Sequence, residues 1–98
     1  MYVAIHHTIT DSQKWDETAR NIMAKIEQGQ LPQGLKALIY LPSVDGHKAD
    51  CVWEANSVDA LRSFIDRETS TAARNEYSAI NAEAAIGLPG QEVVQKAA

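Results

Sequence analysis

Apolar and polar residues alternate along residues 2–9 with a period of two, a pattern typical of a β-strand. Val3, Ile5 and Ile9 fall on one side of this strand, which suits a buried face. The other side is mixed and consists of Tyr2, Ala4, His6 and Thr8. His7 shares the side of Ile5, so the two adjacent histidines point to opposite faces of any sheet that contains the strand.

The next segment changes to a helical period and predicts an amphipathic helix that ends near Gly29. Thr10 and Gln13 have the spacing of a capping box, in which a hydroxyl binds a free backbone N–H of the first turn. Apolar residues then recur at steps of four, three and four, and this stripe consists of Trp15, Ala19, Ile22 and Ile26. Charged residues lie mostly outside the stripe, so the helix is expected to bury one face.

Two apolar runs, residues 35–42 and 49–55, are joined by a short segment that contains an Asp-Gly pair. Such a pattern predicts an antiparallel β-hairpin. A second helix is expected directly after it, because Asn56 or Ser57 can cap the first turn. The apolar face of this helix consists of Val58, Leu61 and Ile65, with Phe64 beside them.

Residues 71–86 admit two interpretations. Their alanine content favours a helix, and four apolar residues keep helical spacing, namely Ala73, Tyr77, Ile80 and Ala84. A strand over residues 75–81, followed by a helical turn over residues 82–86, would instead cover a sheet edge that three strands leave unpaired. We predict the strand, because covering that edge outweighs a weak local preference for helix.

These elements give the order β-α-β-β-α-β and an α+β fold of the ferredoxin-like type, with a four-stranded antiparallel sheet and both helices on one face. We assign residues 1–90 to this domain and residues 91–98 to a C-terminal tail. The other sheet face is expected to expose Leu38, Tyr40 and Val52. Soluble monomers rarely expose such an apolar patch, so two sheets are expected to pair face to face in a homodimer.

Composition excludes several classes of protein. The chain has 98 residues, of which 45% are hydrophobic, and this indicates one globular domain. A formal net charge of −4 argues against a nucleic-acid or membrane-surface partner. The single Cys51 cannot form an internal disulfide, and no apolar run approaches the roughly 20 residues of a membrane-spanning helix. The N-terminus has no signal-peptide pattern, so a cytoplasmic location is expected.

Three stretches carry a resemblance to a known superfamily. They are residues 51–55 (CVWEA) in the hairpin, the capped helix start at residues 57–61 (SVDAL), and residues 75–89, which run from Asn-Glu-Tyr to Ile-Gly-Leu-Pro. The sequence resembles the small dimeric α/β-barrel proteins, and more narrowly their stand-alone families of unknown function. The resemblance implies a ferredoxin-like fold and a homodimer. The superfamily includes small monooxygenases, lactone isomerases, haem-degrading and chlorite-handling enzymes and stress-responsive proteins, so the fold does not select an activity.

The uncovered sheet face holds the residues best suited to chemistry. In a ferredoxin-like sheet the first strand lies between the third and the fourth, so His6 is expected to meet Glu54 on one side. On the other side it is expected to meet Asn81 or Tyr77, with Tyr40 one strand further away. A histidine beside a carboxylate is a usable general base, because the carboxylate fixes the tautomer and stabilises the imidazolium.

The leading interpretation is a protein that binds a small organic molecule, with His6 as general base and Glu54 as the group that orients it. As an enzyme it would be cofactor-free and monooxygenase- or isomerase-like, with Tyr40, Tyr77 and Asn81 positioning the substrate. The alternative is a non-catalytic dimeric interaction or stress-related protein, in which these side chains fill a dimer surface. Ligand and interface roles for the two tyrosines fit the pattern equally well.

No metal site is expected, because no local spacing matches an HExxH helix or a Cys/His finger. His6 and His7 cannot join one such site, since strand parity separates them. Cys51 has no base close to it in the sequence, so it is expected to act as a small buried hydrophobe. Trp15 and Trp53 are expected in the core between helices and sheet.

Overall fold

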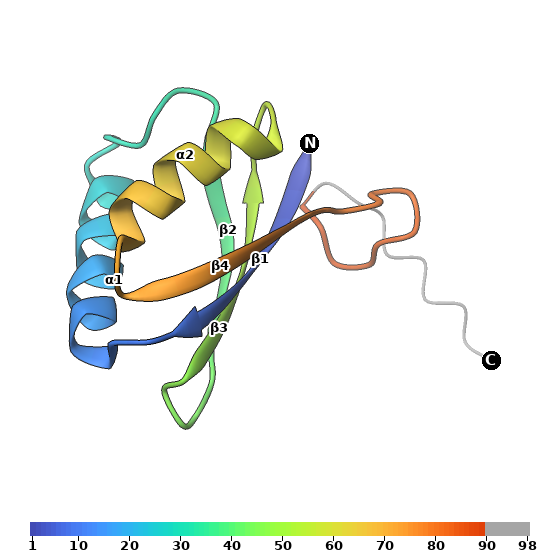
Figure 1. Cartoon of the computed structure of the whole chain (residues 1–98). Coiled ribbons are helices and arrows are strands. Elements are labelled where there is room, and N and C mark those ends of the chain that lie inside the picture. Colours follow the sequence, from blue (N-terminus) through green and yellow to red (C-terminus); the bar gives the residue numbers. More distant parts are fainter. Residues whose placement is uncertain (90–98) are drawn as a thin grey trace.

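The computed structural model of the chain describes residues 1–89 and has the element order β-α-β-β-α-β that the sequence predicts. The six elements are β1 (Tyr2–Ile9), α1 (Ser12–Glu27), β2 (Lys36–Pro42), β3 (Lys48–Glu54), α2 (Val58–Thr69) and β4 (Ala73–Ala79). Both helices lie on one side of the sheet (Figure 1). The ferredoxin-like α+β fold is therefore confirmed, whereas the predicted tail at residues 91–98 lies outside the described residues.

The strands pair in the order β2-β3-β1-β4, and all neighbouring strands are antiparallel. On the central strand β1, Val3, Ile5 and His7 are buried beneath the helices, as the alternation predicts. His6 has the opposite parity, and it lies across from Asp50 of β3 and Glu76 of β4. We call the sheet face without helices the open face; it carries His6, Ile39, Leu41, Asp50, Val52 and Glu76.

Each helix begins at a side chain that accepts a backbone N–H, which satisfies one of the free donors of the first turn. The cap of α1 is Asp11, not Thr10 as the capping-box spacing suggested; the Thr10 hydroxyl donates to the carbonyl of Thr71 instead. Ser57 caps α2, which is one of the two predicted candidates. Within the described residues, neither helix is long and apolar enough to cross a membrane.

The segment with two interpretations forms a strand, so the helical alternative over residues 71–86 is wrong. β4 (Ala73–Ala79) begins two residues earlier than the predicted 75–81 and is followed by a short turn at residues 82–84. Along its whole length β4 pairs with β1, from Ile9 opposite Ala73 to Val3 opposite Ala79. Backbone hydrogen bonds to a neighbouring strand thus outweigh the helical preference of an alanine-rich segment.

An irregularity in β2 changes which of its side chains face the helices. The pairing register with β3 shifts between Ala37 and Ile39, so that one residue of β2 has no direct partner. After this bulge Tyr40 lies opposite Cys51, on the side of the helices. The prediction that Tyr40 belongs to the open face is therefore wrong, because a bulge reverses the parity of every residue that follows it.

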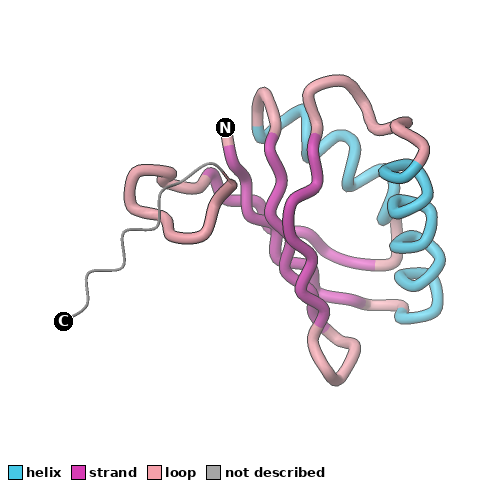
Figure 2. Tube along the Cα trace, turned by 180° about the vertical axis from the view of Figure 1, so that it is seen from behind, coloured by secondary structure: helices cyan, strands magenta, loops and turns pink. Residues whose placement is uncertain are grey.

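The two helices pack against the sheet to different depths. α2 buries four residues, Leu61, Phe64, Ile65 and Thr69, and the first three join the main core with residues of β1 and β3. α1 buries only Trp15, although its apolar stripe continues for three more turns. Trp15 and Trp53 are 7% and 3% exposed, so both are in the core as predicted. Figure 2 shows α1 and α2 on the same side of the strands, and side chains of the α1 stripe line a cavity between this helix and the sheet.

Candidate functional site

A cavity of about 250 Å³ lies between α1 and the strands β2 and β3. Its walls are mostly apolar, because the α1 stripe lines it instead of packing tightly on the sheet. The apolar lining includes Ala19, Ile22, Ile26, Ala37, Leu38 and Trp53. Three side chains that can take part in proton transfer or nucleophilic attack line the same cavity, namely His7 of β1, Tyr40 of β2 and Cys51 of β3. An apolar cavity with a few polar groups is the usual form of a small-molecule site.

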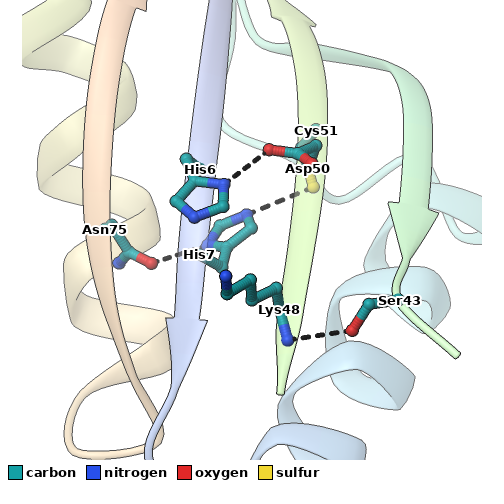
Figure 3. A network of polar contacts seen from close by, with 7 residues as sticks. All are labelled: His6, His7, Ser43, Lys48, Asp50, Cys51 and Asn75. Atoms are coloured by element: carbon teal, nitrogen blue, oxygen red, sulfur yellow. Dashed lines mark hydrogen bonds and ion pairs between the residues drawn. The ribbon is translucent and has the colours of Figure 1, made fainter. Parts of the chain in front are cut away.

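Both ring nitrogens of His7 have partners, and Figure 3 shows them on opposite sides of the imidazole. Nδ1 lies 2.6 Å from Oδ1 of Asn75 on β4, and Nε2 lies 3.2 Å from Sγ of Cys51 on β3. The residue is only 2% exposed. His7 therefore connects the two strands that flank β1 through its side chain as well as its backbone.

The hydrogen bonds of Asn75 fix the tautomer of His7. The amide nitrogen of Asn75 donates to Asp66 over 3.0 Å and to the Thr69 hydroxyl over 2.9 Å. Since an amide nitrogen only donates, the amide oxygen must be the atom that faces His7, and His7 Nδ1 must be the donor. The neutral ring then carries its lone pair on Nε2, where it accepts from the thiol of Cys51.

Burial keeps this pair uncharged at neutral pH. Desolvation lowers the pKa of His7 below its ordinary 6.5, and this outweighs the hydrogen bond to Asn75, which acts in the opposite direction. Desolvation also raises the pKa of the Cys51 thiol to about 12, with a smaller contribution from the negative charge of Asp50. The resting site consequently holds a neutral imidazole beside a neutral thiol, which is the combination that an apolar cavity stabilises.

Trp15 of α1 holds the other side of the His7 ring. The two ring centroids are 4.8 Å apart with an interplanar angle of 53°. The indole N–H of Trp15 donates to the hydroxyl of Tyr40 over 3.1 Å. Because the Tyr40 oxygen is the acceptor in that bond, the Tyr40 hydroxyl hydrogen is not used in it.

The structure does not bring His6 and Glu54 together. His6 does lie on the open face as predicted, but its Nδ1 is 2.7 Å from a carboxylate oxygen of Asp50 (Figure 3). Glu54 lies opposite Tyr2, four residues before His6 on β1. The expected His–carboxylate pair thus exists with a different carboxylate, because the register of β3 against β1 decides which acidic residue meets His6.

Tyr77 and Asn81 also lie away from His6. Tyr77 is on the helix side of β4, and its hydroxyl donates to Asp66 of α2 over 2.6 Å. Asn81 follows the end of β4, where its side chain accepts the backbone N–H of Glu83 over 3.2 Å. Of the five predicted site residues, only Tyr40 lines the cavity. The sequence-based analysis missed His7 and Cys51 as a pair, although strand parity already placed both on the helix side.

We found no metal-ligating cluster in the part of the chain that the structure describes. Within residues 1–89, no three side chains of His, Cys, Asp or Glu lie together in an arrangement that holds a metal ion.

We expect the free energy of unfolding to fall as the pH is lowered from about 7 to about 5, with His7 as a specific contributor. The folded state lowers the pKa of His7, so in this range the unfolded chain binds more protons than the folded chain. The contribution of the neutral His7 ring to stability is fully present above the pKa that His7 has in the unfolded chain. It is lost as the pH falls towards the lower pKa that His7 has in the folded protein. Urea denaturation at several pH values measures this slope.

The matched variants are His7→Gln and His47→Gln, since His47 is exposed in the hairpin turn. His7→Gln should flatten the pH dependence, whatever its effect on stability at pH 7, and His47→Gln serves as the comparison that also removes one histidine. Equal slopes in all three proteins would contradict the assignment of a depressed pKa to His7.

These observations define a small ferredoxin-like α+β protein with an apolar cavity between its first helix and its sheet. Residues 2–88 match the model of a family described as Domain of unknown function (DUF8652), and the chain belongs to that family. Comparison with curated proteins gave no match, and comparison with solved structures gave none.

Proposed function

We propose that this protein binds a small, largely apolar organic molecule in the cavity between α1 and the sheet. The observation that carries the proposal is the cavity itself, about 250 Å³ in volume and lined mainly by apolar side chains. Ligand sites usually measure roughly 300–1,000 Å³, so the volume suits a compact molecule. Its apolar part would lie along the α1 stripe, and an acceptor group would meet the hydroxyl of Tyr40.

The catalytic form of this proposal is cofactor-free proton transfer of the monooxygenase- or isomerase-like kind. His7 is better placed than His6 to act as the base, because its unprotonated Nε2 belongs to a residue that lines the cavity. A base with a pKa below its ordinary value stays neutral, and hence able to accept a proton, at physiological pH. His6 instead contacts Asp50 on the open face, with both side chains substantially exposed.

Filling the cavity should abolish ligand binding. Ala19 lines the cavity from α1, whereas Ala24 lies on the exposed side of the same helix. We expect Ala19→Phe to weaken binding of 4-phenylbutan-2-one, an apolar ring with one carbonyl acceptor, by at least about tenfold, the equivalent of about 1.4 kcal/mol. Ala24→Phe should bind as the wild type does. Ligand-observed NMR and isothermal titration calorimetry measure the affinities.

Native mass spectrometry of the purified protein complements this comparison. A retained organic molecule that is present in the wild type and in Ala24→Phe, but absent from Ala19→Phe, is the expected result. Equal affinity of both variants for the ketone would locate binding outside the cavity. Failure of the wild type to bind it, with no retained molecule, would count against the proposed function.

A homodimer formed through the open face is the second part of the proposal, as in the dimeric α/β-barrel proteins that the sequence resembles. Ile39 lies across from Val52 on this face, and Leu41 lies beside them with 61% of its surface exposed. A second copy of the sheet would remove these apolar side chains from water. The open face supports equally the alternative of a non-catalytic dimeric interaction or stress-related protein. A cytoplasmic location is part of both proposals, since Cys51 is a free thiol.

An acidic substitution in this face should separate the dimer. We expect wild-type protein to sediment as a dimer and Leu41→Asp as a monomer, because a buried unpaired carboxylate is costly. Val44→Asp is the matched control, as Val44 is fully exposed in the hairpin turn. Analytical ultracentrifugation over a range of concentrations distinguishes them. If the wild type sedimented as a monomer at every concentration, the proposed homodimer would be refuted, while the proposal that the cavity binds a ligand would stand.

A further inference from the structure

The contacts of Cys51 place a nucleophile, a base and an orienting group in one chain of hydrogen bonds. Sγ of Cys51 lies 3.2 Å from Nε2 of His7, and Nδ1 of His7 lies 2.6 Å from Oδ1 of Asn75. Asp66 and the hydroxyl of Thr69 hold the amide nitrogen of Asn75. A thiol beside the basic nitrogen of a histidine, whose other nitrogen is fixed by an amide oxygen, is an arrangement that activates cysteine for attack.

The base is necessary here because the thiol does not ionise by itself. Burial holds the pKa of Cys51 near 12, so the thiolate is scarce at neutral pH. Attack by sulfur thus requires that the proton leave as the new bond forms. His7 Nε2 is in position to take this proton, and its neutral state at pH 7 leaves the lone pair available.

The donors around the cavity indicate the class of electrophile. Among the described lining residues, the hydroxyls of Thr18 and Thr69 already donate to backbone carbonyls, and the indole of Trp15 donates to Tyr40. The hydroxyl hydrogen of Tyr40 is left as the donor for a ligand oxygen. A single donor suits a delocalised enolate better than a tetrahedral alkoxide, which enzymes usually hold with a pair of donors.

We propose that Cys51 adds to the electron-poor alkene of an α,β-unsaturated carbonyl compound bound in the cavity, with His7 as general base and Tyr40 donating to the carbonyl oxygen. This inference rests on the proposed function, because the compound must first enter the cavity. Asn75 is a positioning residue that keeps the basic nitrogen of His7 directed at Sγ.

The step balances without any further reactant. The sulfur–carbon bond forms at the β-carbon while the π bond of the alkene breaks, and its electron pair moves to the carbonyl oxygen as an enolate. The thiol proton passes to Nε2 of His7 and is then returned to the α-carbon. No group leaves, so the adduct has the summed mass of protein and enone, and the reverse sequence releases the enone unchanged.

The experiment uses 4-phenylbut-3-en-2-one as the reactive probe and its saturated analogue, 4-phenylbutan-2-one, as the unreactive one. Intact-mass spectrometry follows adduct formation at pH 7, and ligand-observed NMR measures binding of the saturated ketone. We expect the wild type to gain the mass of one enone at least about 10²-fold faster than glutathione does under the same conditions. Cys51→Ser should bind the ketone and form no adduct.

Two further variants test the assigned roles. His7→Gln should slow addition by about 10²-fold, and Tyr40→Phe, which keeps the ring, should slow it by a similar factor. If His7→Gln does not fold, Tyr40→Phe still tests the donor to the enolate. Addition no faster than that of glutathione, or an unchanged rate in His7→Gln or Tyr40→Phe, would overturn the proposal. If the wild type bound the saturated ketone but formed no adduct with the enone, this inference alone would be overturned. If the wild type bound neither probe, the proposed function would be refuted as well.

Discussion

Replacing Trp53 with alanine is expected to lower the free energy of unfolding by about 3–5 kcal/mol, the range for truncating a buried aromatic residue. Trp53 is 3% exposed and belongs to the main core cluster. Its ring meets Phe64 of α2 edge-on, with centroids 6.1 Å apart. It also lines the cavity beneath α1, so its removal would join the core to a space that is already poorly filled. Domains of this size are typically stable by only about 5–15 kcal/mol, which makes the loss a large fraction of the total.

Urea denaturation followed by circular dichroism measures this effect, with two comparison variants. Trp53→Phe retains an aromatic ring against Phe64 and should recover a substantial part of the lost stability. Val44→Ala removes apolar atoms from a fully exposed turn and should change stability by less than about 0.5 kcal/mol. A cost for Trp53→Ala as small as that for Val44→Ala would mean that Trp53 is not packed in the core.

Replacing Asn75 with alanine is expected to destabilise the fold by about 1–3 kcal/mol, because it leaves several polar groups without partners. In the wild type the Asn75 side chain accepts from His7 and donates to Asp66 and Thr69. Deleting one side chain thus breaks three hydrogen bonds, of which the one to His7 belongs to a fully buried ring.

The same variant has a spectroscopic consequence that a purely structural role would not produce. Without the Asn75 oxygen, the proton of the neutral His7 ring is no longer held on Nδ1, so the nitrogen-15 chemical shifts of the ring should report a mixture of tautomers. Ser78→Ala is the matched control, since Ser78 is exposed on the same strand and faces the other side of the sheet. Unchanged histidine shifts in Asn75→Ala would show that Asn75 does not set the tautomer.

The unequal packing of the two helices explains why the candidate site lies where it does. α2 supplies most of the helical contribution to the core, so it holds the sheet and the hairpin in place. α1 is fixed at one end by the buried Trp15, and its remaining apolar residues line the cavity. Part of the apolar surface of α1 therefore lines the cavity instead of packing on the sheet, and it is this surface that the proposed ligand would cover.

Local sequence patterns predicted most of the architecture. The alternation in residues 2–9 and the hairpin signal gave strands within one residue of the observed bounds, and Ser57 was one of two candidate caps for α2. A fourth strand was predicted at residues 75–81 against the alanine content of the segment, from the need to cover a sheet edge, and it is observed at residues 73–79. Strand parity also placed His6 and His7 correctly on opposite faces.

The composition of the site was harder to predict, because it depends on contacts between residues far apart in the chain. Two features were decisive, the bulge that turned Tyr40 towards the helices and the register that gave His6 the carboxylate of Asp50 instead of Glu54. A shift of one residue moves a side chain to the other face, and sequence periodicity does not fix such a shift between strands.

The sequence by itself thus determined the order of the elements, the buried face of each and the ferredoxin-like fold, because periodicity and capping act within a few residues. Only the tertiary structure decided that His7, Cys51 and Asn75 meet. These three side chains come from three strands, and their contacts of 3.2 Å and 2.6 Å depend on the register of β3 and β4 against β1. This register is set by the packing of the whole domain, which no local pattern encodes.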